Sequence, residues 1–105
     1  MATLYVKHPR GQAVGYQKLT VDSTSGGVGL TLPDVSPAPD AALVTVETAG
    51  ARYKVTGAPS ATEGHLVGDG DAFCISGNQL SEFRAFRTSG TSATFHVTYY
   101  RNLEA

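Results

Sequence analysis

The sequence has little charge for its length. Only 16% of its 105 residues are charged, and the formal net charge is −1 at pH 7, whereas about 25% is usual in soluble domains. Proteins dedicated to binding nucleic acid normally carry a basic surplus or a basic stripe, so the composition argues against that class. A weakly charged surface rich in Thr, Ser and Gly costs little to desolvate and favours packing against other proteins. Ordinary β domains share this composition, so both interpretations stay open.

Cysteine and long apolar runs are scarce as well. Cys74 is the single cysteine, which excludes a disulfide within the chain and a cysteine-based metal site. Its apolar neighbours Phe73 and Ile75 predict a small core residue. The first residues lack the apolar stretch of a secretion signal, and no apolar run is long enough to cross a bilayer. We therefore expect a soluble protein that is made in a cytoplasm and has no membrane partner.

The clearest element that is present is a strand predicted at residues 92–101. Apolar and polar side chains alternate there, which is the period of a strand with one buried face. Burying each inward side chain contributes roughly 1.5–3 kcal/mol, against a net stability of about 5–15 kcal/mol for a whole domain. Loss of this strand should therefore unfold the domain. The predicted inward residues are Phe95, Val97 and Tyr99.

The outward side of the same strand is the candidate contact site. Its side chains are large or β-branched yet nearly uncharged, which suits a surface that packs against a second sheet or a second subunit. A histidine in such a contact would make assembly depend on pH, because histidine changes its charge between about pH 5 and 8. The predicted assembly contact consists of Thr94, His96, Thr98 and Tyr100.

The rest of the chain predicts about eight or nine short strands and no convincing helix. Turn signals recur about every 8–12 residues, which is typical of an antiparallel β-sandwich or small barrel. We therefore predict an all-β, jelly-roll-like single domain over residues 1–105, in which strands 41–48 and 52–55 form a hairpin. The predicted strands are residues 2–7, 14–22, 28–32, 41–48, 52–55, 65–67, 73–75, 79–87 and 92–101.

Two connecting segments have distinct chemistry. Three prolines within residues 33–39 prevent a helix or a central strand and predict a stiff surface loop. Asp69-Gly70-Asp71 resembles the start of a calcium loop, but such a loop requires a glutamate at its twelfth position. Leu80 stands there, so we predict a hairpin turn instead.

No catalytic, cofactor or metal site is predicted. His8, His65 and His96 form no closely spaced pair with another histidine or a cysteine, and Glu47, Glu63 and Glu82 are scattered. Nucleophilic catalysis needs a base held beside the nucleophile, and the apolar surroundings of Cys74 should raise the pKa of its thiol. An enzyme would require a metal held by residues far apart in the sequence, so we do not expect one.

Two weaker surface features leave alternatives open. Three arginines would form a positive patch if the last two predicted strands pair; otherwise they are solvated charges that discourage edge-to-edge aggregation. These are Arg84, Arg87 and Arg101. The tyrosines are candidate platforms for a carbohydrate, although tryptophan is lacking. They are Tyr5, Tyr16, Tyr53, Tyr99 and Tyr100.

A succession of short segments from Leu43 onward carries a family resemblance. The segments are Val44-Thr45-Val46-Glu47-Thr48-Ala49, Arg52-Tyr53, Gly64-His65-Leu66, Gly68-Asp69-Gly70-Asp71, Phe83-Arg84-Ala85-Phe86-Arg87 and His96-Val97-Thr98-Tyr99-Tyr100. In their order they resemble small structural proteins of tailed bacteriophages and prophages, over about half of the chain. Similar sequences often have an acidic residue and a glycine before the proline loop, where this chain has Thr56-Gly57-Ala58-Pro59.

The resemblance implies a β-sandwich or jelly roll attached to a virion, without catalytic residues or a cofactor. We expect a head decoration, or cement, protein on the capsid surface that contacts the major capsid protein. We also expect self-association as a dimer or trimer, because closed symmetry lets many weak contacts add up. The alternatives are a tail, neck or fibre component and a carbohydrate-binding β module of the virion.

Overall fold

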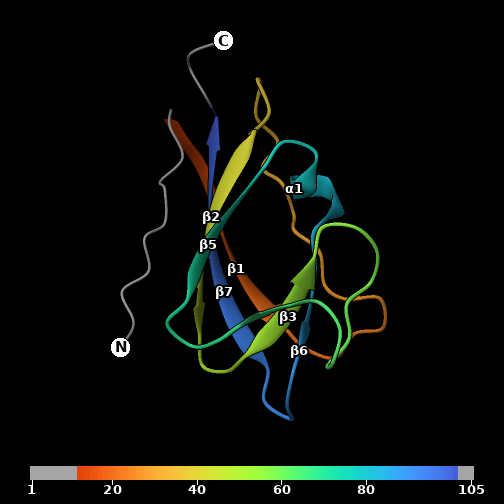
Figure 1. Ribbon diagram of the computed structural model, residues 1–105. Coiled ribbons are helices and arrows are strands. Elements are labelled where there is room, and N and C mark those ends of the chain that lie inside the picture. The colour runs from red at the N-terminus through yellow and green to blue at the C-terminus, as the bar shows by residue number, and fades with distance from the viewer. Residues whose placement is uncertain (1–11, 102–105) are drawn as a thin grey trace.

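Two antiparallel β-sheets face each other in the computed structural model, which describes residues 12–101 (Figure 1). The four-stranded sheet has the order β1-β7-β2-β5 and the three-stranded sheet the order β4-β3-β6. The predicted all-β fold of two packed sheets is therefore confirmed, whereas the strand predicted at residues 2–7 lies outside the described residues. The elements are β1 (Gln12–Val21), β2 (Ala41–Glu47), β3 (Ala51–Lys54), β4 (His65–Val67), β5 (Ala72–Ser76), α1 (Gln79–Glu82), β6 (Arg84–Arg87) and β7 (Ala93–Arg101).

The chain is wound like one long hairpin folded over on itself. The first strand pairs with the last, β2 pairs with β5, and β3 pairs with β4. Val28 completes the series through an isolated bridge to Ala85 of β6. The first half of the chain thus pairs, in reverse order, with the second half. Further pairing of β2 with β7 and of β3 with β6 joins these ribbons into the two sheets.

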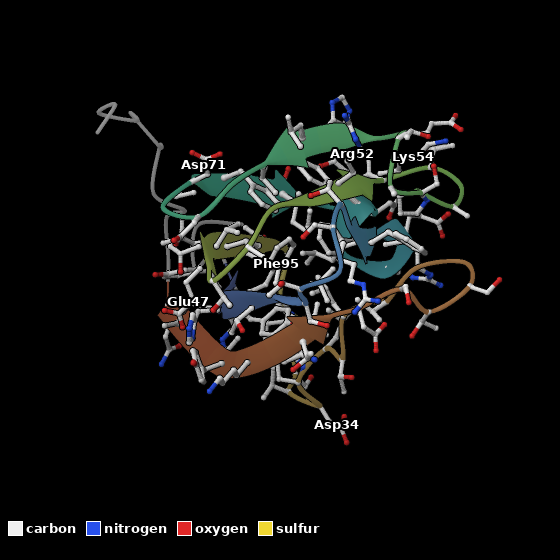
Figure 2. All side chains as sticks on the ribbon, turned by 90° about the horizontal axis from the view of Figure 1, so that it is seen from below. Asp34, Glu47, Arg52, Lys54, Asp71 and Phe95 are labelled. Atoms are coloured by element: carbon white, nitrogen blue, oxygen red, sulfur yellow. The ribbon has the colours of Figure 1, made fainter. Side chains whose placement is uncertain are left out.

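One apolar core holds the two sheets together. Aromatic rings from both sheets meet in it: the rings of Tyr53 and Phe73 stack with centroids 4.4 Å apart, and Phe83 and Phe95 are fully buried beside them. Figure 2 shows Phe95 in the middle of the molecule, between the two layers. The predicted inward residues of β7 are all at most 1% exposed: Phe95, Val97 and Tyr99.

Gln17 links the core to the loop that follows β1. Its Oε1 accepts a hydrogen bond from the Tyr99 hydroxyl at 2.7 Å and another from the Thr31 backbone N–H at 3.0 Å. Burial raises the pKa of Tyr99 to about 12, so its phenol stays protonated and keeps donating at neutral pH. Gly15 lets the loop approach closely, because a Cβ there would lie 2.9 Å from Cγ of Pro33.

Two predicted elements are wrong for local reasons. Residues 28–32 are not a strand: Val28 alone forms a bridge, and the Thr31 N–H bonds to a side chain instead of a neighbouring strand. Residues 79–87 are not one strand either, because the single turn α1 precedes β6. The change from α1 to β6 places Phe83 in the core with no exposed surface.

The predicted hairpin of β2 and β3 is also wrong, because the two strands belong to different sheets. The chain leaves the four-stranded sheet at Thr48, whose φ of +83° is the one positive value at a non-glycine among residues 12–101. This backbone conformation strains a β-branched residue, and it directs the chain across the sandwich instead of back along β2. The described part of the chain holds no helix long and apolar enough to span a membrane.

Candidate functional site

The outer side of the four-stranded sheet gathers the outward side chains of its strands, and we call it the open face. All four predicted contact residues lie on it, because β7 runs between β1 and β2. Of the side chains on the open face, only Lys18 and Glu47 are formally charged at neutral pH. Its members include Tyr16, Lys18 and Thr20 of β1; Thr94, His96, Thr98 and Tyr100 of β7; Leu43, Thr45 and Glu47 of β2; and Cys74 of β5.

Tyr16 is the most prominent aromatic side chain of the open face. It is 62% exposed, and its ring stacks beside that of His96, with centroids 6.0 Å apart and planes 23° apart. The β7 residues around it are half-buried. The face therefore presents an exposed ring on a surface of threonines, with little charge to desolvate.

A line of hydrogen bonds crosses three strands of the open face. The Tyr16 hydroxyl lies 2.6 Å from Nδ1 of His96, and Nε2 of His96 contacts Oε1 of Glu47. An ionised carboxylate only accepts hydrogen bonds, so Nε2 carries the hydrogen of the neutral imidazole. Nδ1 is then the acceptor, and the Tyr16 hydroxyl donates to it.

The line is polarised by the ionisation of Glu47. The hydrogen bond from His96 lowers the pKa of the Glu47 carboxyl, and the positive charges of protonated His96 and of Lys18 lower it further. Glu47 is therefore ionised at neutral pH and balances the charge of Lys18. Residues 12–101 contain no group of three or more His, Cys, Asp or Glu that could hold a metal ion. The arrangement offers an aromatic ring with hydrogen-bonding groups beside it, which is chemistry for recognition.

Two of these residues were missed by sequence reasoning. The sequence predicts Glu47 to be an isolated carboxylate and Tyr16 to be a possible platform for a sugar. The alternation of residues 14–22 does place Tyr16 and Lys18 on one side of a strand. However, β1 lies beside β7 in a register that pairs Lys18 with His96. This pairing joins segments far apart in the chain, and no local sequence pattern predicts it.

The prediction that Cys74 is a core residue is wrong, because its side chain is exposed. Phe73 and Ile75 face Val44 and Ala42 across the inner side of the sheet, so strict alternation turns the residue between them outward. Partial burial nevertheless raises the pKa of its thiol. Cys74 thus extends the open face onto the edge strand β5.

The predicted arginine patch does not form, because β6 and β7 belong to different sheets. Each of the three guanidinium groups has a different hydrogen-bond partner. Arg84 donates to the Phe83 carbonyl at 2.8 Å, Arg87 donates to Oγ of Ser92 at 3.4 Å, and Arg101 donates to the Ser36 carbonyl at 2.9 Å.

The tyrosines do not form one platform either. Tyr53 stacks inside the sandwich and Tyr99 is buried, so only Tyr16 and the half-buried Tyr100 lie on the open face, while Tyr5 is outside the described residues. His65 is exposed on β4 with its ring 5.3 Å from that of Tyr53, and His8 is outside the described residues.

Residues 68–71 form a turn, but the predicted hairpin is wrong, because the turn joins β4 to β5 and these strands belong to different sheets. Oδ2 of Asp71 accepts a hydrogen bond from the Gly68 N–H at 2.7 Å, and Gly70 adopts a φ of +95°. The Asp71 N–H also donates to the Gly68 carbonyl at 2.9 Å, so both the side chain and the backbone of Asp71 close the turn.

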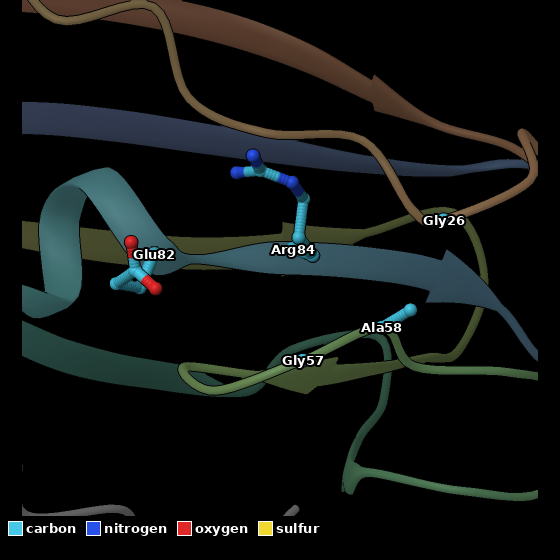
Figure 3. Close-up of a pocket in the computed structure, with 5 residues that line it drawn as sticks. All are labelled: Gly26, Gly57, Ala58, Glu82 and Arg84. Carbon is cyan, nitrogen blue, oxygen red and sulfur yellow. The ribbon is translucent and has the colours of Figure 1, made fainter.

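A shallow hollow of about 270 Å³ lies elsewhere, lined by Gly26, Gly57, Ala58, Glu82 and Arg84 (Figure 3). In that view the guanidinium of Arg84 points away from Gly57 and Ala58, and its Nη1 is bonded to backbone carbonyls of residues 81 and 83. The guanidinium of Arg84 is therefore engaged by the backbone, and the open face, where several polar groups are bonded to one another, is the better candidate site.

Comparisons with known proteins identify no relative. No family model, no curated protein and no solved structure matches this chain. The interpretation of the open face therefore rests on its geometry and chemistry.

Proposed function

We propose that this protein is a virion structural protein, a decoration protein that binds a phage head and stabilises it by protein–protein contacts. The observation that carries the proposal is the open face. It spans four strands, keeps an exposed ring at Tyr16, and carries only the balancing charges of Lys18 and Glu47. A surface of this kind loses little hydration energy when a protein covers it, since charged residues are depleted at the cores of interfaces.

The winding of the chain supports the proposal. With Val28 counted as a strand position, the two sheets have the orders β1-β7-β2-β5 and Val28-β6-β3-β4. This order is consistent with the predicted jelly roll, a fold found in viral capsid domains and lectins. A fold can host many functions, so the sequence resemblance suggests the virion, and the open face is the surface we propose for the contact.

Weak contacts suffice for this role. Specific interfaces bury about 800 Å² on each partner, and repetition around the symmetry axes of a shell adds many such contacts. A decoration protein therefore needs a flat, uncharged contact surface more than a deep pocket. The partner expected for it is the major capsid protein, with the virion surface as its location.

Binding of the purified protein to expanded phage heads tests the proposal. Thr98→Lys places a charge in the middle of the open face and should weaken binding to heads about tenfold or more. Thr91→Lys, in the exposed loop before β7, is the matched control and should bind like the natural chain. Unchanged binding of Thr98→Lys, or density for the chain only on the tail in cryo-electron microscopy, would refute the head assignment.

A second candidate function is carbohydrate binding by the same face. It is favoured by the exposed ring of Tyr16 beside the polar groups of His96 and Glu47, because sugars stack on aromatic rings and bond to neighbouring polar groups. A glycan array compares the natural chain with Tyr16→Ala. Glycan binding that Tyr16→Ala abolishes would support this function, and an array without any bound glycan would remove it.

A further inference from the structure

We propose that the open face binds a second copy of this chain about a twofold axis that lies over β7 and runs parallel to it, and that protonation of His96 separates the two copies. The inference rests on the proposed function, since it concerns the same face: a second copy covers the open face in the free protein, and the capsid takes its place on a head. It does not need a capsid, so the pairing can be tested on the isolated protein.

The placement of the two charges favours a second copy as the partner. Lys18 projects from β1 on one side of the central strand β7, and Glu47 projects from β2 on the other side. Lys18 lies level with His96, and Glu47 lies level with Thr94, the next outward position of β7. One face thus carries a cation and an anion on opposite sides of β7.

A twofold axis parallel to β7 makes this arrangement self-complementary. The rotation brings the β1 side of one copy against the β2 side of the other, so each Lys18 faces the partner's Glu47 region, and the contact occurs twice. An axis across the strands would instead place β1 against β1, where the cations are. Stacked sheets prefer nearly aligned strands, which the first arrangement provides.

The same arrangement places the two His96 rings close together, because β7 lies at the axis. The titratable or charged groups facing His96 are Tyr16 and Lys18 from β1 and Glu47 from β2. While His96 is neutral, Lys18 and Glu47 cancel and the face carries no net charge. Each protonated His96 adds one positive charge, and the two charges meet at the axis.

Pairing should therefore weaken as the pH falls. Two facing imidazolium groups repel each other, so the paired state takes up fewer protons than two separate copies do. By linkage, the state that holds fewer protons loses population as protons become more available. The change should occur between about pH 7.5 and pH 5, where histidine changes its charge.

Sedimentation equilibrium of the full chain across this pH range tests the switch. We expect a dimer at pH 7.5 whose Kd rises about tenfold or more at pH 5. His96→Gln keeps a hydrogen-bonding side chain that does not titrate, and its dimer Kd should be constant. His65→Gln and His8→Gln are controls that should retain the natural response. A natural chain that stays monomeric at pH 7.5, or a His96→Gln dimer that still dissociates at pH 5, would overturn the inference.

Two charge-reversal variants test the geometry. Lys18→Glu leaves two anions on the face and Glu47→Lys leaves two cations, so each variant alone should be monomeric. Mixed in equal amounts, they should form a heterodimer at pH 7.5, because each Lys then meets a Glu across the axis. A mixture that stays monomeric, although circular dichroism shows both variants to be folded, would refute the twofold arrangement.

The outcomes separate the two proposals. A pH-dependent dimer that does not bind heads keeps the pairing and removes the decoration function. Binding to heads by a chain that remains monomeric keeps the decoration function and removes the pairing.

Discussion

The outer faces of the two sheets differ in the partners of their polar side chains. On the three-stranded sheet, Arg52 donates from Nε to the Ala61 carbonyl at 3.2 Å and from Nη1 to the Gly64 carbonyl at 2.9 Å. Lys54 lies 3.5 Å from the carboxylate of Glu63. The loop between β3 and β4 is thus fastened to that side, which we call the covered face. Figure 2 shows Arg52 and Lys54 on the opposite side of the molecule from Glu47.

The difference lies in which part of the chain bonds to the polar side chains of each face. The cations of the covered face have partners supplied by a neighbouring loop, although Leu66 on its edge strand β4 remains 63% exposed. The polar groups of the open face bond to one another, along the line from Tyr16 through His96 to Glu47. A face that satisfies its polar groups internally and keeps its rings exposed is ready to be covered by another molecule.

The largest expected effect contrasts the two sides of β7. Phe95→Ala removes a ring with no exposed surface and should lower the free energy of unfolding by about 3–5 kcal/mol. Thr94→Ala, the neighbouring residue on the open face, should change it by no more than about 0.5 kcal/mol. Urea unfolding followed by circular dichroism measures both. Similar losses would mean that the open face is part of the folding core.

The next effect concerns the covered face. Arg52→Ala removes both bonds to the loop and should lower the free energy of unfolding by about 1–3 kcal/mol, while making residues 56–64 more sensitive to proteases. Lys18→Ala, on the open face, is the matched control and should cost no more than about 0.5 kcal/mol. Equal urea midpoints and equal proteolysis rates for the two variants would erase the distinction between the faces.

A smaller effect of opposite sign is expected where the chain leaves one sheet for the other. Thr48 has a φ of +83°, a conformation that costs a non-glycine residue about 1 kcal/mol or more. Thr48→Gly should therefore raise the free energy of unfolding by up to about 1 kcal/mol, because the added freedom of the unfolded chain offsets part of the gain. Thr45→Gly, inside β2, should lower it by about the same amount. A destabilised Thr48→Gly would show that the threonine side chain has a favourable role.

The smallest effect is a pH dependence within the open face. His96 holds the pKa of the Glu47 carboxyl below its ordinary value of 4.5, so the folded state binds that proton less tightly than the unfolded chain. The stability from this pair is present above the ordinary pKa and is lost as the pH falls through the lowered one. Glu47→Gln should therefore flatten the decline of the urea midpoint between about pH 5 and 3. Parallel curves for the two proteins would show that the pair does not contribute.

Patterns of short range were predictable from the sequence. The alternation of residues 92–101 correctly assigned every inward side chain of β7 from Phe95 to Tyr99, because a strand with one buried face leaves a period of two. The turn at residues 68–71 was predictable because its glycines and aspartates act locally. The location of the four predicted contact residues on one face follows from the same alternation.

Features set by distant contacts were not predictable. The Thr31 N–H bonds to the Gln17 side chain and not to a neighbouring strand, so residues 28–32 do not form the predicted strand. The positive φ of Thr48 directs the chain from the first sheet to the second. The line from Tyr16 to Glu47 requires the register of three strands that are far apart in the sequence. The apolar run around Cys74 suggested that the cysteine is buried. Only its neighbours Phe73 and Ile75 face the core, and Cys74 lies on the outer side of the sheet.

The line across the open face also has a direction. When His96 is neutral, the Tyr16 hydroxyl donates its hydrogen to Nδ1 of His96, and its oxygen can accept a hydrogen bond from a neighbouring molecule. Once His96 is protonated, Nδ1 becomes a donor and the Tyr16 oxygen must accept from it, which turns the phenolic hydrogen outward. Proton uptake at the imidazole therefore turns the exposed hydroxyl of Tyr16 from an acceptor into a donor toward a neighbouring molecule. A neighbouring molecule that donates to the Tyr16 oxygen at neutral pH would compete in acid with the Nδ1–H of His96. The hydrogen bonding of the Tyr16 hydroxyl to a partner therefore depends on the protonation state of His96.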